Sequence, residues 1–244
     1  MSDFEAQWRR RFERFAACHE SDHQVSGWSL AGLRQRVTIF ERLLERGLLA
    51  EGSRVLELGC GAGTYVRLLG KRGHVVVGLD YSFPSLARAA AADPGRLGRY
   101  VAASTYALPF PSGAFDAVTC VGVLQVLARP EAAIAEMARV LAARGIVLVE
   151  TLNAWSPVAA LRRLTAFSQG RPSRLRYSTA GVVERAMAAQ GIAPVQRIGV
   201  LLPPKSLPGL AEPLARPSVQ RILGCTPGIS AVAAHAFWLV GTKT

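Results

Sequence analysis

The sequence is poor in cysteine and has no long apolar run. Its 244 residues include four cysteines, and none of them are spaced as C-x-x-C. This spacing predicts neither a disulfide framework nor a zinc site, so we expect no bound metal. No apolar stretch approaches the roughly 20 residues that a membrane-spanning helix needs. The first residues are charged and carry no signal-peptide core, and we therefore expect a cytoplasmic protein.

Acidic residues are also scarce: 17 Asp and Glu stand against 29 Lys and Arg, for a formal net charge of +12. The imbalance is concentrated in residues 151–229, which hold ten basic and two acidic residues. Such a segment suits an anionic substrate, a membrane surface or RNA, but it is equally consistent with a solvated face that binds nothing. Charge alone leaves these alternatives open.

A glycine-rich turn organises the rest of the chain. Residues 55–58 indicate a short buried strand, glycines follow at every second position, and an apolar helix-like run begins at Tyr65. Such a turn lets a ligand approach the backbone closely, and its N–H groups are expected to face outward. A second strand-like run, residues 74–79, ends at Asp80, where an acid usually holds a ribose diol. The stretch predicts a nucleoside-containing cofactor bound across one strand–helix–strand unit.

The spacing of the turn distinguishes between two kinds of cofactor. The dinucleotide fingerprint is G-x-G-x-x-G, whereas Gly59, Gly61 and Gly63 give G-x-G-x-G. Glu57 stands two residues before the turn, where it would repel a pyrophosphate and favour a cationic ligand with an amino-acid end. The run 55–63, Val-Leu-Glu-Leu-Gly-Cys-Gly-Ala-Gly, resembles the first motif of the class I S-adenosylmethionine-dependent methyltransferases.

A second motif supports this resemblance. Residues 107–118, Ala-Leu-Pro-Phe-Pro-Ser-Gly-Ala-Phe-Asp-Ala-Val, resemble the middle motif of the same family. The family has an Asp four residues before the Leu of this motif, where it accepts a hydrogen bond from the adenine amino group. Ser104 holds that position here, and a hydroxyl accepts without charge assistance. Adenine binding is then expected to depend on the backbone and on packing by neighbours such as Tyr81.

Taken residue by residue, the resemblance implies a set of contacts to S-adenosylmethionine. The glycine turn contacts the cofactor, Glu57 supports its amino-acid end directly or through water, and Asp80 accepts from both ribose hydroxyls. Ser104 and Thr105 lie by the adenine. The expected cofactor-binding residues are Glu57, Gly59, Gly61, Gly63, Asp80, Tyr81, Ser104, Thr105 and Val121.

The pattern of the whole chain predicts the fold. Strand-like and helix-like runs alternate up to about residue 150, which is typical of a doubly wound parallel sheet. The resemblance implies an α/β fold with seven strands in the order 3-2-1-4-5-7-6 and an antiparallel seventh strand. Beyond the glycine turn, strands are expected at residues 74–79, 99–103, 145–149, 198–202 and 234–240, with one more ending at Val121.

Two parts of the chain are expected to cover this sheet. Residues 1–50 are predicted to form an N-terminal helical lid, in which residues 18–28 are a loop. Residues 51–244 are predicted to form a Rossmann-like domain, with lid insertions at about 151–177 and 203–229 that form a cap. The lid helix carries Phe4, Trp8, Phe12 and Phe15 at helical spacing, which either pack in the core or face the mouth of the active site.

Methyl transfer from a sulfonium is an in-line displacement that depends mainly on alignment. A hydroxyl acceptor would need a base, and the candidate catalytic residues are His23 and Tyr177. Carbon or nitrogen acceptors need none. Trp28, Trp155 and Tyr177 are expected near the acceptor, and the Leu-, Trp- and Pro-containing lid favours a small apolar metabolite. We expect O-methylation in preference to C- or N-methylation.

Three other functions remain open. An NAD(P)-dependent oxidoreductase would need G-x-G-x-x-G and a Tyr-x-x-x-Lys pair, and the sequence has neither. An RNA-directed methyltransferase could use the basic 151–229 segment, although the sequence has no Asn-Pro-Pro-Tyr motif. A subunit that binds the cofactor but does not catalyse a reaction would be consistent with Ser104 in place of the family's Asp. The expected partner is a small-molecule substrate and not nucleic acid, with peripheral membrane or lipid-substrate contact left open, in a monomer or homodimer.

Overall fold

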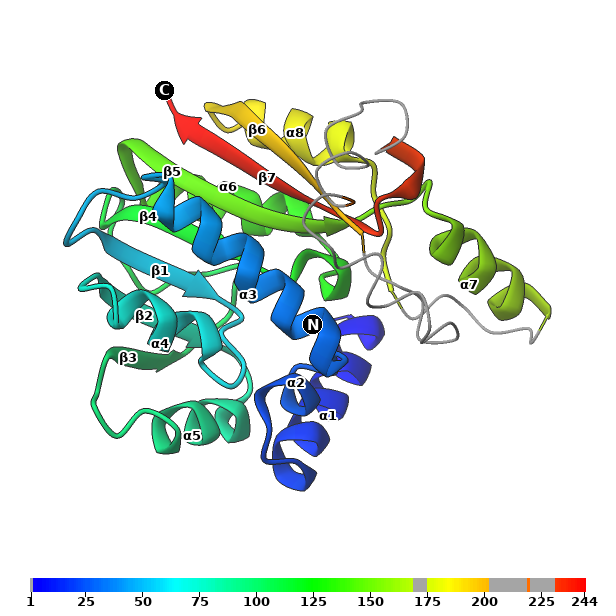
Figure 1. Cartoon of the computed structure of the whole chain (residues 1–244), viewed down its shortest axis with the longest axis horizontal. Helices are drawn as coiled ribbons and strands as arrows, with labels where there is room; N and C mark the ends of the chain where they lie inside the picture. Colours follow the sequence, from blue (N-terminus) through cyan, green and yellow to red (C-terminus); the bar gives the residue numbers. More distant parts are fainter. Residues whose placement is uncertain (1, 169–174, 202–218, 220–230) are drawn as a thin grey trace.

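The computed structural model describes residues 2–168, 175–201, 219 and 231–244, and its centre is a seven-stranded sheet (Figure 1). The strand order is β3-β2-β1-β4-β5-β7-β6, and β7 runs antiparallel to both of its neighbours. The predicted fold class and strand order are therefore confirmed. The strands are β1 (Arg54–Leu58), β2 (Val75–Asp80), β3 (Gly98–Ala102), β4 (Phe115–Cys120), β5 (Leu141–Leu152), β6 (Ile192–Val200) and β7 (Ala236–Lys243).

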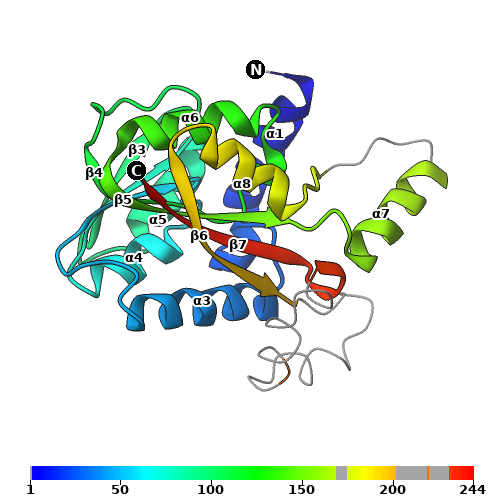
Figure 2. The ribbon, with the colours of Figure 1, turned by 90° about the horizontal axis from the view of Figure 1, so that it is seen from above.

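Helices cover both faces of the sheet. Figure 2 shows the sheet between α3 (Leu30–Glu45) and α4 (Thr64–Gly70) on one side and α6 (Pro130–Val140) and α8 (Ala180–Ala188) on the other. Each face buries its own apolar cluster, with Phe40 of α3 on one side and Met137 of α6 on the other. The remaining helices are α1 (Asp3–Cys18), α2 (Asp22–Val25), α5 (Phe83–Ala91), the 3₁₀ turn η1 (Leu124–Val126) and α7 (Pro157–Ser168).

Short side chains fix where these helices begin. Ser29 accepts a hydrogen bond from the N–H of Gly32 at 3.1 Å, and Ser82 accepts one from the N–H of Ser85 at 3.3 Å. Ser2 caps α1 and forms a reciprocal capping box with Glu5. Such caps satisfy N–H groups that a helix start leaves without a partner. The helices that follow Ser29 and Ser82 therefore begin directly after these serines.

The structure departs from the sequence-based boundaries most clearly at three places. The predicted loop at residues 18–28 contains α2. β5 begins at Leu141, directly after α6, and its pairing with β4 shifts register before it resumes at Ile146. β6 begins at Ile192, because Pro194 sits at a register shift and does not end the strand. The predicted insertion at 203–229 lies outside the described residues, apart from residue 219.

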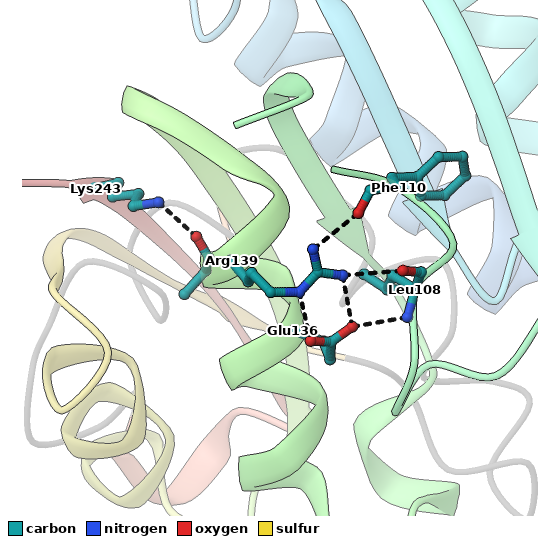
Figure 3. A network of polar contacts seen from close by, with 6 residues as sticks. Leu108, Phe110, Glu136, Arg139 and Lys243 are labelled. Carbon is teal, nitrogen blue, oxygen red and sulfur yellow. Dashed lines mark hydrogen bonds and ion pairs between the residues drawn. The ribbon is translucent and has the colours of Figure 1, made fainter. Parts of the chain in front are cut away.

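The second sequence motif is anchored to α6 by a polar network (Figure 3). The N–H of Leu108 donates to Glu136 at 2.7 Å, and Arg139 donates to the carbonyls of Leu108 and Phe110 at 2.9 and 2.8 Å. At the end of α6, Lys243 of β7 donates to two backbone carbonyls at 2.7 Å. The Leu-Pro-Phe turn is therefore fixed to the helix behind it, which positions the loop after β3.

Candidate active site

A cavity opens at the carboxyl ends of β1, β2 and β4. Ligands of open α/β sheets bind at this edge. The lining comes from α1, from the loops around α2 and from the segments that follow the three strands. The lining residues are Phe12, Val25, Ser26, Trp28, Gly59, Cys60, Gly61, Thr64, Tyr65, Asp80, Tyr81, Ser85, Thr105, Val121, Gly122, Val123, Val126 and Leu127.

The glycine turn forms one wall of this cavity, and its glycines have different roles. Gly59 and Gly61 line the cavity with φ of 65° and 51°, a left-handed conformation that favours glycine. A Cβ on Gly59 would lie 2.3 Å from a methyl group of Val123. Gly63 does not line the cavity. It begins α4, and a Cβ there would lie 3.0 Å from both Ala89 and the hydroxyl of Tyr100, so it permits close packing.

The N–H groups of this turn are largely paired within the protein, contrary to the expectation that they face outward. The N–H groups of Gly59 and Cys60 donate to the carbonyl of Leu79 at 2.7 and 3.0 Å. The N–H of Gly61 donates to Asp80 at 3.0 Å. The turn is thus fixed to the end of β2, and it presents a ligand mainly with a surface that has no side chains.

Asp80 is the acid at the end of β2, and the structure holds its carboxylate in one orientation. One oxygen accepts from the N–H of Gly61 at 3.0 Å and the other from the N–H of Ser82 at 2.8 Å. Burial raises the pKa of Asp80, and the backbone donors act against this rise. Each carboxylate oxygen keeps a lone pair, so Asp80 can still accept from a diol in the cavity that it lines.

Glu57 lies behind the glycine turn and does not line the cavity. Its register partner on β4 is Thr119, whose hydroxyl donates to one carboxyl oxygen. The other oxygen, Oε1, is buried and has no partner among the described residues. Complete burial raises the pKa of Glu57 to about 8, with the Thr119 hydrogen bond opposing the rise. An unpaired buried carboxyl oxygen fits a cationic amino end or a bridging water.

Of the residues expected near the adenine, Thr105 and Tyr81 line the cavity and Ser104 does not. Ser104 is exposed, and its hydroxyl accepts from the N–H of Tyr106 at 3.2 Å. Thr105 is buried and lines the cavity, as do Tyr81 and Val121. The Tyr81 hydroxyl is buried without a partner among the described residues. Of the two hydroxyls that the sequence places near the adenine, the structure brings only Thr105 to the cavity.

Neither candidate base reaches the cavity. The hydroxyl of Tyr177 accepts from Arg162 at 2.9 Å, and His23 lies on α2, outside the lining. His235 does not line it either, and burial together with Arg36 and Arg162 lowers its pKa to about 3. Among the residues that the structure describes, no group of three or more His, Cys, Asp or Glu side chains could hold a metal ion.

Trp28, which the sequence predicts near the acceptor, has neighbours that the sequence gave little reason to select. Trp28 lines the cavity, as predicted, and it lies against Gly122, where a Cβ would come within 2.3 Å of the indole. The Arg36 guanidinium lies 4.5 Å from the Trp28 ring and forms a 2.7 Å ion pair with Glu150, and both charged groups are buried. Tyr65 also lines the cavity, and its hydroxyl is buried with no partner among the described residues.

Helix α1 contributes to the wall of the cavity, and Glu5 bonds it to neighbouring loops. Phe12 of α1 lines the cavity. The carboxylate of Glu5 accepts from the hydroxyl of Tyr106 and, at 3.2 Å, from the N–H of Ala128. Burial acts against ionisation, yet the hydrogen bonds from Tyr106, Ser2 and Ala128 lower the pKa of Glu5 to about 2. The predicted lid is therefore in contact with the loops after β3 and η1.

Known proteins share these features. Residues 56–149 match the family model described as a methyltransferase domain. Over 201 residues the chain is 31% identical to the malonyl-[acyl-carrier protein] O-methyltransferase of Erwinia pyrifoliae, covering 80% of this chain and 68% of that protein. It is 39% identical over 123 residues to the demethylmenaquinone methyltransferase of Thermus thermophilus, covering 49% of this chain and 54% of that protein.

A solved methyltransferase structure also shares this fold. The structure of magnesium protoporphyrin IX methyltransferase from Synechocystis PCC 6803, with bound S-adenosylhomocysteine, superposes with a TM-score of 0.66 at 16% identity. That match covers 99% of this chain and 100% of the other, and it shows the fold alone. The chain spans about half the length of several curated relatives that it matches.

The chain belongs to the class I S-adenosylmethionine-dependent methyltransferases, as its motifs predict. The cavity fits the cofactor of that family. Asp80 can accept from the ribose diol, the glycine turn leaves room for the backbone approach, and Glu57 has an unpaired oxygen behind the turn. Membership of this family argues against the oxidoreductase alternative.

Proposed function

We propose that this protein transfers a methyl group from S-adenosylmethionine to a small, mostly apolar acceptor that carries an acidic hydroxyl or carbon. The observation that carries the proposal is the composition of the cavity beyond the glycine turn. Its wall there is made of apolar side chains, and the acceptor would lie against them: Phe12, Val25, Trp28, Val121, Val123, Val126 and Leu127. Such a wall binds apolar rings and chains and gives little to a charged substrate.

The scarcity of bases in the cavity further limits which acceptors could react there. Among the described residues, the titratable side chains that line it are Cys60, Tyr65, Asp80 and Tyr81. Burial raises the pKa of Cys60, of Tyr65 and of Tyr81, so all three stay protonated near neutral pH. An acceptor that is much more acidic than an alcohol can release its proton to water as the methyl group is transferred, without a protein base. A quinol, a phenol or an enolisable carbon meets this condition, and a named relative acts on demethylmenaquinone.

The residues have complementary tasks in such a reaction. S-adenosylmethionine, when bound, supplies an electrophilic methyl group on a sulfonium. Asp80 and the glycine turn hold the donor's nucleoside, and Glu57 favours its amino end. Trp28 and Phe12 position the acceptor and exclude water, while the Tyr65 hydroxyl can donate to its oxygen. The acceptor's electron pair forms the new bond to the methyl carbon as the carbon–sulfur bond breaks, and its electrons stay on sulfur.

A labelled transfer assay tests this proposal. The full chain is incubated with methyl-labelled S-adenosylmethionine and with menadiol, caffeic acid, malonyl-acyl carrier protein or tRNA, and label and product mass are measured. We expect the quinol or phenol to gain one methyl group, with no transfer by the Asp80→Ala variant. Label found only on tRNA, or on none of these acceptors, would contradict the proposed substrate class.

A further inference from the structure

Helix α7 carries large apolar side chains that the protein does not bury. It follows β5, and within it only Ala159 is buried. Leu161, Leu164 and Phe167 are 55%, 64% and 85% exposed, and Trp155, just before the helix, is 69% exposed. The helix of a folded domain normally turns its apolar stripe toward the core. Figures 1 and 2 both show α7 projecting from the body of the molecule.

The exposed residues of α7 form an amphipathic pattern. At 3.6 residues per turn, Leu161, Leu164 and Phe167 fall within an arc of about 120° on the helix surface. Arg163 lies about 40° beyond one edge of this arc and Arg162 about 100° beyond the other, and both are exposed. Neither forms an ion pair with any residue that the structure describes, although Arg162 donates to the hydroxyl of Tyr177. An apolar stripe between two arginines suits an interface with an apolar interior and an anionic surface.

The segment that surrounds α7 is positively charged, like the two arginines of the helix. Residues 151–201 contain seven arginines and a single acidic residue, Glu184. That acid is already paired with Arg197 at 2.5 Å. The segment is therefore strongly positive, and it would be attracted to an anionic surface within about a Debye length.

We propose that α7 docks this protein on an anionic lipid bilayer. Trp155, Leu161, Leu164 and Phe167 enter the boundary between headgroups and acyl chains, and Arg162 and Arg163 contact lipid phosphates. Because α7 follows β5 at the carboxyl edge of the sheet, docking brings the edge that carries the cavity toward the membrane. This inference deepens the proposed function, because an apolar acceptor held in a bilayer could then reach the cavity.

RNA explains the same surface less well. Polyanion binding rests on rows of cations that neutralise phosphates, and aromatic side chains stack on bases. Leu161 and Leu164, half of the exposed apolar residues, are aliphatic and gain little from contact with RNA, whereas all four residues can enter the boundary of a bilayer. Among described residues, no helix is long and apolar enough to cross a membrane, so the contact proposed here lies at the surface.

Flotation of the full chain with vesicles tests the docking. One set of vesicles is phosphatidylcholine alone, and the other contains phosphatidylcholine and phosphatidylglycerol. We expect flotation with the anionic vesicles, and a partition constant at least about tenfold lower for the Leu164→Glu/Phe167→Glu variant. Arg162→Gln/Arg163→Gln should remove the preference for anionic vesicles. The matched control is Val195→Glu, which places a charge on an exposed apolar residue of β6 and should float as the wild type does.

S-adenosylhomocysteine binding is measured on every variant, and unchanged affinity shows that the cavity is intact. The proposal is overturned if the wild type does not float with anionic vesicles, or if Leu164→Glu/Phe167→Glu floats equally well. It is also overturned if vesicles fail to bind while the arginine variant loses affinity for tRNA, or while Leu164→Glu/Phe167→Glu dissociates a dimer. Flotation is scored without an acceptor, so absence of methyl transfer would count only against the proposed function.

Discussion

At the scale of single residues, Gly122 shows how a missing Cβ shapes the acceptor end of the cavity. Its φ is 79°, and an added Cβ would lie 2.3 Å from the Trp28 ring. We therefore expect Gly122→Ala to lower the free energy of unfolding by about 1–3 kcal/mol, from left-handed strain and crowding. It should also raise the KM for the acceptor while the affinity for S-adenosylhomocysteine changes little. Denaturant titration and steady-state kinetics measure these effects.

The matched control for this change is Gly73→Ala. Gly73 has a similar φ of 83°, but an added Cβ would meet nothing within 4 Å. Gly73→Ala should therefore show the backbone strain alone. If it costs as much stability as Gly122→Ala and the acceptor KM is the same in both variants, the contact with Trp28 does not shape the site.

The raised pKa of Glu57 predicts how the stability of the protein depends on pH. Its pKa is raised from 4.5 to about 8 in the folded protein, so between these values the native state binds a proton that the unfolded chain has lost. The contribution of Glu57 to stability is full below pH 4.5 and falls as the pH rises toward 8. The stability of Glu57→Gln relative to the wild type should therefore increase over this window and level off above it. Urea titrations at several pH values measure this difference, and a difference that is independent of pH would refute the assignment.

At the scale of elements, a hydrogen bond from the Tyr106 hydroxyl to Glu5 joins α1, the proposed lid, to the loop after β3. Hydrogen bonds to charged groups contribute about 1.5–3 kcal/mol, so Tyr106→Phe should speed amide exchange in α1 by at least about tenfold. The pKa of Glu5 falls from 4.5 to about 2 on folding, so the stabilisation is present above pH 4.5 and lost as the pH falls toward 2. Exchange measured by mass spectrometry at neutral and acidic pH tests both statements.

Tyr100→Phe provides the control for the Tyr106→Phe variant. In the wild type, the hydroxyl of Tyr100 donates to Asp93, which is not part of α1, at 3.2 Å. The two variants lose the same atom from the same residue type, so exchange in α1 should rise for Tyr106→Phe alone. Equal protection of α1 in both variants would show that Glu5 does not hold the lid.

The elements also show what a sequence can and cannot predict. The strand order was predictable because two motifs fix the family, and the caps at Ser29 and Ser82 were predictable from local chemistry. The start of β5 was missed because its first residues, Leu-Ala-Ala-Arg, favour a helix. β6 was placed too late because proline usually ends a strand, whereas Pro194 is accommodated at an irregularity in the pairing. In both cases the pairing with a neighbouring strand, and not the local sequence preference, fixed where the strand begins.

The candidate site likewise has features that the sequence could predict and features that it could not. Asp80 and the glycine turn follow each other closely in a strand–turn–helix pattern, so their meeting was predictable. The neighbours of Trp28 were not, because Arg36 and Glu150 are separated by 114 residues and meet only through the fold. Ser104 and Thr105 are adjacent hydroxyl residues, and only the course of the loop after β3 decides which faces the cavity.

At the scale of the whole molecule, the structure combines three surfaces at one edge of the sheet. The glycine turn and Asp80 form the proposed donor side, and Trp28 with Phe12 of α1 forms the proposed acceptor side. The third is α7, which extends from the same edge (Figure 1). On the proposal made above, the exposed arginines of α7 lie where an apolar acceptor would reach the protein. The account as a whole depends on the first surface, since without a bound donor the other two have no reaction to serve.

Calorimetric titration with S-adenosylhomocysteine tests that surface most directly. We expect saturable binding to the wild type, and an affinity at least about tenfold lower for Asp80→Ala, because the ribose loses its charged acceptor. Circular dichroism and thermal unfolding check that the variant is folded. Equal affinity of a folded Asp80→Ala variant, or no heat with the wild type, would contradict the central claim that this edge of the sheet binds the methyl donor.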